Sequence, residues 1–132
     1  MPEGSLIPAM TTQARMDILR TYSKRDGLPD AHNGDIPPVT RVLVYGRHEG
    51  CMACRLTKRE LDKAVYPYEF VDVDEVPDEA QAVSAVTNHV ALPVVVVTFR
   101  DNSYTSWGGM SVEQIKQLTR LSHQMRVAGK AA

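Results

Sequence analysis

The sequence has little of several features that mark particular classes of protein. Its 132 residues include only two cysteines, and no apolar run approaches the length of a membrane span. Fifteen basic and 16 acidic residues leave a net charge of −1, which favours neither nucleic acid nor a membrane surface as a partner. The first residues, MPEG, lack the basic and apolar regions of a secretory signal. We therefore expect a cytoplasmic protein, monomeric and large enough to bury a core without disulfides.

The two cysteines that are present lie three residues apart, at Cys51 and Cys54, between a strand pattern at 42–45 and a helical pattern at 56–65. A cysteine that a loop delivers to a helix start meets free backbone N–H groups and the positive end of the helix dipole. Both favour the thiolate, which is the nucleophilic form. The second cysteine falls on the same helix face. This spacing predicts that Cys51 attacks a disulfide and that Cys54 resolves the mixed disulfide.

Residues 1–38 differ from the rest of the chain and form a predicted N-terminal extension. They hold five of the eight prolines, which break up any regular pattern. Within them, Thr11–Thr12 can cap a short helix whose apolar positions, Met16, Leu19 and Tyr22, recur at helical spacing. We expect an extension that is irregular apart from this helix and only loosely docked on the domain that follows.

A regular alternation of strand and helix patterns begins at Val39 and predicts one domain over residues 39–132. Strands are expected at 41–45, 68–73, 94–99 and 104–107, and helices at 51–65 and from 77 to about 88. Asp101–Asn102 can turn the strand at 94–99 back into an antiparallel hairpin. Ser111 and Gln114 form a capping-box pattern that opens a last helix. Its expected core stripe is Ile115, Leu118, Leu121 and Met125.

This order of elements predicts a fold class. A strand, a helix and a strand in succession give a parallel pair, whereas a hairpin gives an antiparallel pair. The order β-α-β-α-β-β-α, with CxxC opening the first helix, is typical of the thioredoxin-like α/β fold. We therefore expect a four-stranded mixed sheet flanked by three helices, preceded by the N-terminal extension.

Five short segments resemble those of a known family. They are CMACRLTKRELDKA at 51–64, PYE at 67–69, VDVD at 71–74, ALPVV at 91–95 and WGGM at 107–110. Together they resemble the NrdH-redoxin branch of the glutaredoxins, over roughly residues 41–122. The resemblance implies a dithiol protein that passes electrons to ribonucleotide reductase and is reduced again by thioredoxin reductase. It also implies that no cofactor is bound and that Cys51–Cys54 is a redox-active disulfide.

The resemblance also implies roles for individual residues. Cys51 would be the nucleophile and Cys54 the resolving thiol. Leu92–Pro93 would be a cis peptide bond that leaves the backbone of Leu92 free to pair with an incoming peptide strand. The other matched positions would order the site or its docking surface, and they are Arg47, Thr57, Lys58, Trp107 and Gly108. On the residues alone, Trp107 can equally be a core aromatic and Lys58 part of a solvated helix face.

The sequence departs from the family pattern in two places. The loop Gly46–Gly50 is one residue longer than is usual in the family, and Glu49 in it would oppose thiolate formation unless its side chain points away. The glycine pair Gly108–Gly109 is followed by Met110–Ser111 instead of the acidic pair that commonly contacts glutathione in glutaredoxins. A glutathione-dependent glutaredoxin is therefore the alternative within the same class of enzyme.

Two alternatives come from other classes of protein. His48, Cys51 and Cys54 could hold a metal if His89 or His123 supplied a fourth ligand, and a dimer could share an iron–sulfur cluster. The chain could instead be an interaction module that binds its partner through the N-terminal extension.

Overall fold

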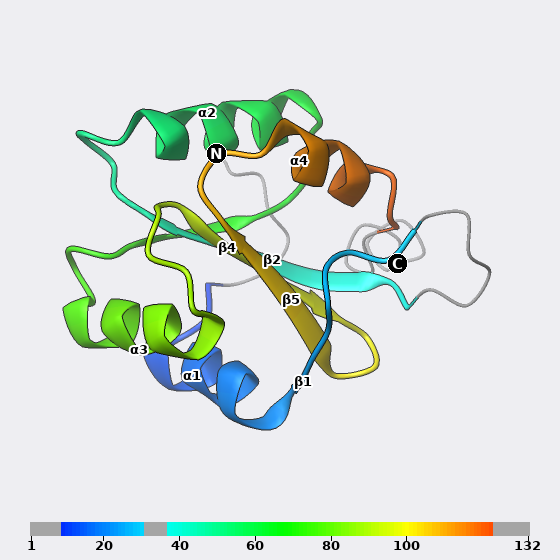
Figure 1. Cartoon of the computed structure of the whole chain (residues 1–132), viewed down its shortest axis with the longest axis horizontal. Coiled ribbons are helices and arrows are strands. Elements are labelled where there is room, and N and C mark those ends of the chain that lie inside the picture. Colours follow the sequence, from blue (N-terminus) through cyan, green and yellow to red (C-terminus); the bar gives the residue numbers. More distant parts are fainter. Residues whose placement is uncertain (1–8, 31–36, 123–132) are drawn as a thin grey trace.

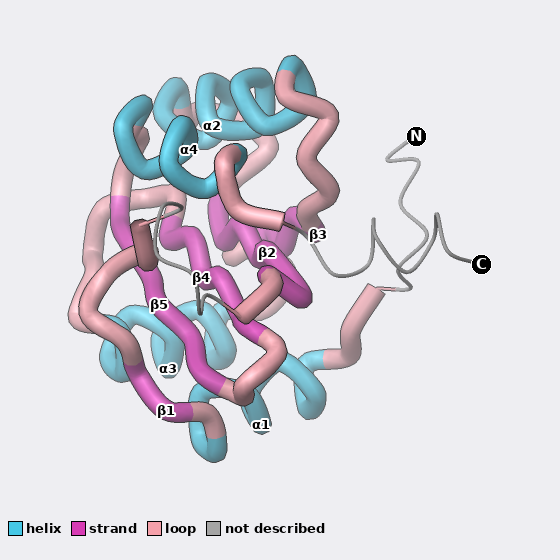
Figure 2. The backbone as a smooth tube through the Cα atoms, turned by 90° about the vertical axis from the view of Figure 1, so that its right-hand side faces the viewer, coloured by secondary structure: helices cyan, strands magenta, loops and turns pink. Residues whose placement is uncertain are grey.

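The computed structural model of the chain describes residues 9–30 and 37–122 (Figure 1). In chain order the elements are α1 (Thr12–Thr21), β1 (Ser23–Lys24), β2 (Val39–Gly46), α2 (Met52–Lys63), β3 (Glu69–Asp72), α3 (Pro77–Thr87), β4 (Val94–Phe99), β5 (Ser103–Gly108) and α4 (Val112–Thr119). The strands form one mixed sheet in the order β1-β5-β4-β2-β3. Helices α2 and α4 cover one face of the sheet, and α1 and α3 cover the other (Figure 2).

From β2 onward the chain follows the order β-α-β-α-β-β-α, as predicted. Strand β2 pairs in parallel with β3 and antiparallel with β4, and β4 forms an antiparallel hairpin with β5. The turn of this hairpin contains Asn102 at a φ of 62°, a left-handed conformation that asparagine tolerates. All six residues of β4 are buried. The strand lies inside the sheet with helices on both faces, which explains its continuous apolar run.

Alternate residues of β2 face the two helical layers, because successive side chains of a strand point to opposite faces. Val44 belongs to the buried cluster that includes Leu61 of α2. Its neighbour Tyr45 belongs to the cluster on the other face, which includes Ile18 of α1 and Val83 of α3. The carboxyl end of β2 therefore contacts both layers.

The described part of the N-terminal extension is packed against the domain, which corrects the expectation of loose docking. The predicted short helix forms as α1, and Thr11 caps it by accepting a hydrogen bond from the N–H of Ala14 at 3.1 Å. Strand β1 pairs in parallel with β5, so the sheet has five strands instead of four. A strand of two residues is too short to show the alternation that predicts strands. The division of the chain at residues 38 and 39 remains a proposal.

A buried ion pair fastens α1 to α3. Arg15 donates two hydrogen bonds to the carboxylate of Glu79, at 2.5 and 2.8 Å, and the hydroxyl of Tyr45 donates a third at 2.6 Å. Burial alone would raise the pKa of Glu79, but the hydrogen bonds from Arg15 and Tyr45 outweigh burial and hold that pKa below its ordinary value of 4.5. The ionised carboxylate therefore stabilises the packing of the extension.

The last helix is capped in only half of the predicted way. Ser111 Oγ accepts a hydrogen bond from the N–H of Gln114 at 3.2 Å, as in a capping box. The side-chain oxygen of Gln114 is buried, and among the described residues it has no hydrogen-bond partner. Ile115, Leu118 and Leu121 are buried as expected. Met125 lies outside the described residues.

Candidate redox site

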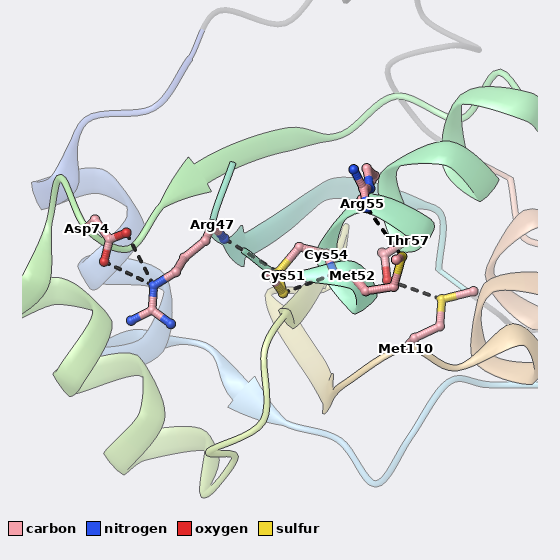
Figure 3. Close-up of a disulfide and its surroundings, with 8 residues drawn as sticks. All are labelled: Arg47, Cys51, Met52, Cys54, Arg55, Thr57, Asp74 and Met110. Carbon is pink, nitrogen blue, oxygen red and sulfur yellow. Dashed lines mark hydrogen bonds and ion pairs between the residues drawn. A yellow bond between two sulfur atoms is a disulfide. The ribbon is translucent and has the colours of Figure 1, made fainter. Parts of the chain in front are cut away.

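The two cysteines lie at the start of α2, where the loop after β2 enters the helix. Cys51 is the N-cap residue, with an extended backbone (φ −135°, ψ 97°), and its sulfur accepts a hydrogen bond from the N–H of Cys54 at 3.2 Å. A disulfide joins Cys51 and Cys54, whose Cα atoms are 5.3 Å apart (Figure 3). One free N–H of the first helical turn, that of Cys54, thus faces the Cys51 sulfur at the helix start.

The two sulfurs differ in their surroundings. The side chain of Cys54 is completely buried, whereas Cys51 is half-buried. The N–H of Arg47 donates a hydrogen bond to Cys54 Sγ at 3.4 Å. Cys51 is therefore the cysteine that an incoming disulfide can approach from solvent.

The guanidinium group of Arg47 does not face the disulfide. It pairs with both carboxylate oxygens of Asp74, at 3.1 and 3.2 Å, and it points away from the sulfurs (Figure 3). Only the backbone N–H of Arg47 reaches the site. The Glu49 side chain is exposed. Asp74 was not predicted as a site residue, although it belongs to the VDVD segment.

Phe70 of β3 contacts two side chains near this region, those of Lys58 and His48. The Lys58 ammonium lies 4.1 Å from the centroid of the Phe70 ring, which is a cation–π contact. The imidazole of His48 packs on the same ring, with centroids 4.6 Å apart. Lys58, which the resemblance assigns to the site, is thus held against an aromatic ring. Phe70 was not predicted as a site residue, because an aromatic residue in a strand is usually part of the hydrophobic core.

Residues 92 and 93 are joined by a cis peptide bond, as the resemblance implied. The N–H of Gly109 donates to the carbonyl oxygen of Pro93 at 2.8 Å. A Cβ atom at Gly108 would lie 3.0 Å from His89 Cβ and 3.1 Å from the oxygen of Ala91. Gly108 therefore lets the end of β5 pack closely against the loop that carries Pro93.

Two of the expected site residues lie in the interior. Thr57 is fully buried, and its hydroxyl donates to the sulfur of Met110 at 3.3 Å (Figure 3). Trp107 is 6% exposed and belongs to the core beneath α2 and α4. Its indole N–H has no hydrogen-bond partner among the described residues. Both residues can support the site from below, and neither presents its side chain at an open surface.

The histidines expected as metal ligands do not gather around the cysteines. The ring of His89 contacts Ser106 Oγ at 3.2 Å, and His48 lies 3.9 Å from Asp72. Within residues 9–30 and 37–122, no group of three or more metal-ligating side chains is found. His123 lies outside the described residues. In the same described segments, no helix has the length and apolar character needed to cross a membrane.

Comparisons with known proteins agree with this geometry. The family model of the glutaredoxins matches residues 42–100. The glutaredoxin-like protein NrdH of Escherichia coli (strain K12) is 31% identical over 83 residues, which are 63% of this chain and 94% of that protein. The protein of the same name from Salmonella typhimurium is 32% identical over 82 residues, or 62% of this chain and 93% of that protein.

A solved structure is similar as well. It is that of the glutaredoxin-like protein NrdH-redoxin from Escherichia coli, a protein with a thioredoxin-like activity profile. It matches with a TM-score of 0.51 and 32% identity and covers 60% of this chain and 95% of that chain. This likeness confirms the thioredoxin-like α/β fold that the sequence predicted.

Proposed function

We propose that this chain, which belongs to the NrdH-redoxin branch of the glutaredoxin family and is a thiol–disulfide oxidoreductase, donates electrons to ribonucleotide reductase. We further propose that thioredoxin reductase reduces it again. It would act as a monomer in the cytoplasm, without a bound cofactor. Its redox group would be the Cys51–Cys54 pair.

The proposed mechanism rests on the difference in burial between the two cysteines. Cys51, half-buried at the helix N-terminus, attacks a substrate disulfide as a thiolate, which forms a mixed disulfide and releases one substrate thiol. Cys54, completely buried behind it, then attacks Cys51 Sγ and releases the second substrate thiol. The dithiol becomes a disulfide, and two electrons pass to the substrate. A reductase that attacks Cys51 Sγ returns the pair to the dithiol.

The source of electrons distinguishes the two candidate enzymes. We expect the protein to turn over a protein disulfide with NADPH and thioredoxin reductase, and to be much slower with glutathione, glutathione reductase and NADPH. Insulin serves as a general disulfide substrate, and ribonucleotide reductase, assayed by deoxyribonucleotide formation, as the specific one. Faster turnover with the glutathione system would instead favour the glutathione-dependent glutaredoxin.

One observation supports the ranking of these two candidates. The Arg47 guanidinium, which stands where the family usually has a lysine, is engaged by Asp74 and points away from the disulfide. In this arrangement its Nε is paired with Asp74, and the side chain is turned away from Cys51, to which a small thiol would bond. The Asp74→Asn variant would release Arg47, and an increase in its glutathione-dependent turnover would support this explanation.

A further inference from the structure

Gly46, the last residue of β2, has no room for a side chain because the sulfur of Cys54 occupies that space. A Cβ atom at position 46 would lie 2.7 Å from Cys54 Sγ and 3.2 Å from Cε1 of Phe70. Non-bonded heavy atoms pack best at about 3.5–4.0 Å, so one of these groups would have to move. The φ of Gly46 is not in the left-handed region. Space, and not backbone conformation, therefore requires glycine here.

The same close approach brings Cys54 Sγ to a backbone donor. The next residue along the chain, Arg47, donates its N–H to that sulfur at 3.4 Å. The Cys54 side chain is completely buried, so water does not solvate the sulfur. A buried charge without a hydrogen-bond donor is costly, and a donor therefore matters most when Cys54 ionises.

We propose that Gly46 is a positioning residue for the second step of the reaction. Its missing side chain lets Cys54 Sγ reach the N–H of Arg47, which stabilises the Cys54 thiolate that attacks the mixed disulfide. This inference rests on the proposed roles of Cys51 and Cys54. In that step Cys54 loses its proton and bonds to Cys51 Sγ, and the bond from Cys51 to the substrate sulfur breaks. The substrate leaves as a thiolate and takes up a proton.

The aromatic disulfide dithiobis(nitrobenzoate) separates the two steps, because each step releases one coloured thionitrobenzoate ion. Attack by Cys51 releases the first ion and leaves the other aryl thiol bonded to Cys51 Sγ. Attack by Cys54 releases the second ion and closes the Cys51–Cys54 disulfide. Reduced protein is mixed with one equivalent of the reagent, and stopped-flow absorbance gives both rate constants.

In the Gly46→Ala variant we expect the first release to stay within about twofold of wild type and the second to slow by about tenfold at neutral pH. A weaker hydrogen bond leaves less Cys54 as thiolate, so the second release should recover as the pH is raised. The pH of its half-maximal rate therefore moves upward. A general loosening of the fold would not move this pH profile.

Two further variants isolate the contact with Cys54. In the double variant Gly46→Ala, Phe70→Leu, the side chain at position 70 is shorter, so the new methyl group meets only Cys54. We expect this double variant to be as slow in the second release as Gly46→Ala alone. In the Cys54→Ser background only one ion is released, and Gly46→Ala should leave its rate unchanged. Equal slowing of both releases, or full recovery with Phe70→Leu, would overturn the proposal.

A second measurement does not depend on the folding of Gly46→Ala. In the Cys51→Ser protein, Cys54 is a free thiol, and the backbone amide proton of Arg47 should shift in NMR spectra as Cys54 titrates. An Arg47 amide that does not follow this titration would contradict the proposed hydrogen bond. Failure of the proposed function looks different, since wild-type protein would then release no second ion, or Cys51→Ser would still react at the wild-type rate.

Discussion

Cys51 and Cys54 differ in how much of each side chain solvent reaches, although they belong to one motif. If Cys51 is the attacking sulfur, Cys54→Ser leaves the first step intact and removes the second. We expect Cys54→Ser to accumulate a covalent complex with a disulfide substrate, visible on non-reducing gels and cleaved by dithiothreitol. Cys51→Ser should form no such complex. Disulfide reduction by Cys51→Ser would show that the nucleophile has been misassigned.

Val65 is a second residue whose environment makes a clear prediction. It follows the end of α2 at a φ of 52°, and its side chain is 75% exposed. A β-branched residue is strained in the left-handed region, where glycine is not, and exposure means that little packing would be lost. We expect Val65→Gly to raise the free energy of unfolding by about 1 kcal/mol, measured by urea denaturation. Val65→Ala, which keeps a Cβ atom, should gain less than half as much.

At the scale of a single element, two substitutions at the start of α4 test how the N-terminus of this helix is stabilised. Ser111 satisfies one free N–H of the first turn, whereas the Gln114 side-chain oxygen is buried without a partner among the described residues. Ser111→Ala should therefore lower the free energy of unfolding by about 1 kcal/mol. Gln114→Met removes a polar atom that gains nothing from burial, so it should be neutral or stabilising. A large loss in Gln114→Met would show that the Gln114 side-chain oxygen is hydrogen-bonded in solution.

At the scale of the whole molecule, the Arg15–Glu79 pair joins the N-terminal extension to the domain. Both side chains are at least nine-tenths buried, and removing one partner of such a pair leaves the other charge uncompensated. We expect Glu79→Gln to lower the free energy of unfolding by about 3 kcal/mol at neutral pH. Asp78→Asn, the same charge change at the exposed neighbouring position of α3, should cost well under half of that.

The same pair predicts how stability depends on pH. The pKa of Glu79 is lower in the folded protein than its ordinary value of 4.5, so the unfolded chain binds the proton more tightly. The stability that ionised Glu79 adds to the fold is therefore fully present above pH 4.5 and is lost as the pH falls through the pKa of Glu79 in the folded protein. The difference in unfolding free energy between wild type and Glu79→Gln should shrink below pH 4.5. A difference that stays constant into acid would contradict an ionised Glu79.

The sequence by itself determined what depends on local pattern. The cysteine pair at a helix start, the strand at 94–99 and the helix that begins at Pro77 follow from local residue pattern and from residues at element ends, and the structure has all three. Residue types within a few positions of one another encode these features. They are therefore readable before any tertiary contact is known.

Only the tertiary structure decided which distant segments meet. Arg15 and Glu79 are 64 positions apart, and β1 gains its partner β5 only because α1 has docked on the face beside α3. The room at Gly46 is likewise set by how α2 packs over the end of β2, which places Cys54 Sγ where a side chain would otherwise lie. Contacts of this kind depend on packing between elements, and no local periodicity records them.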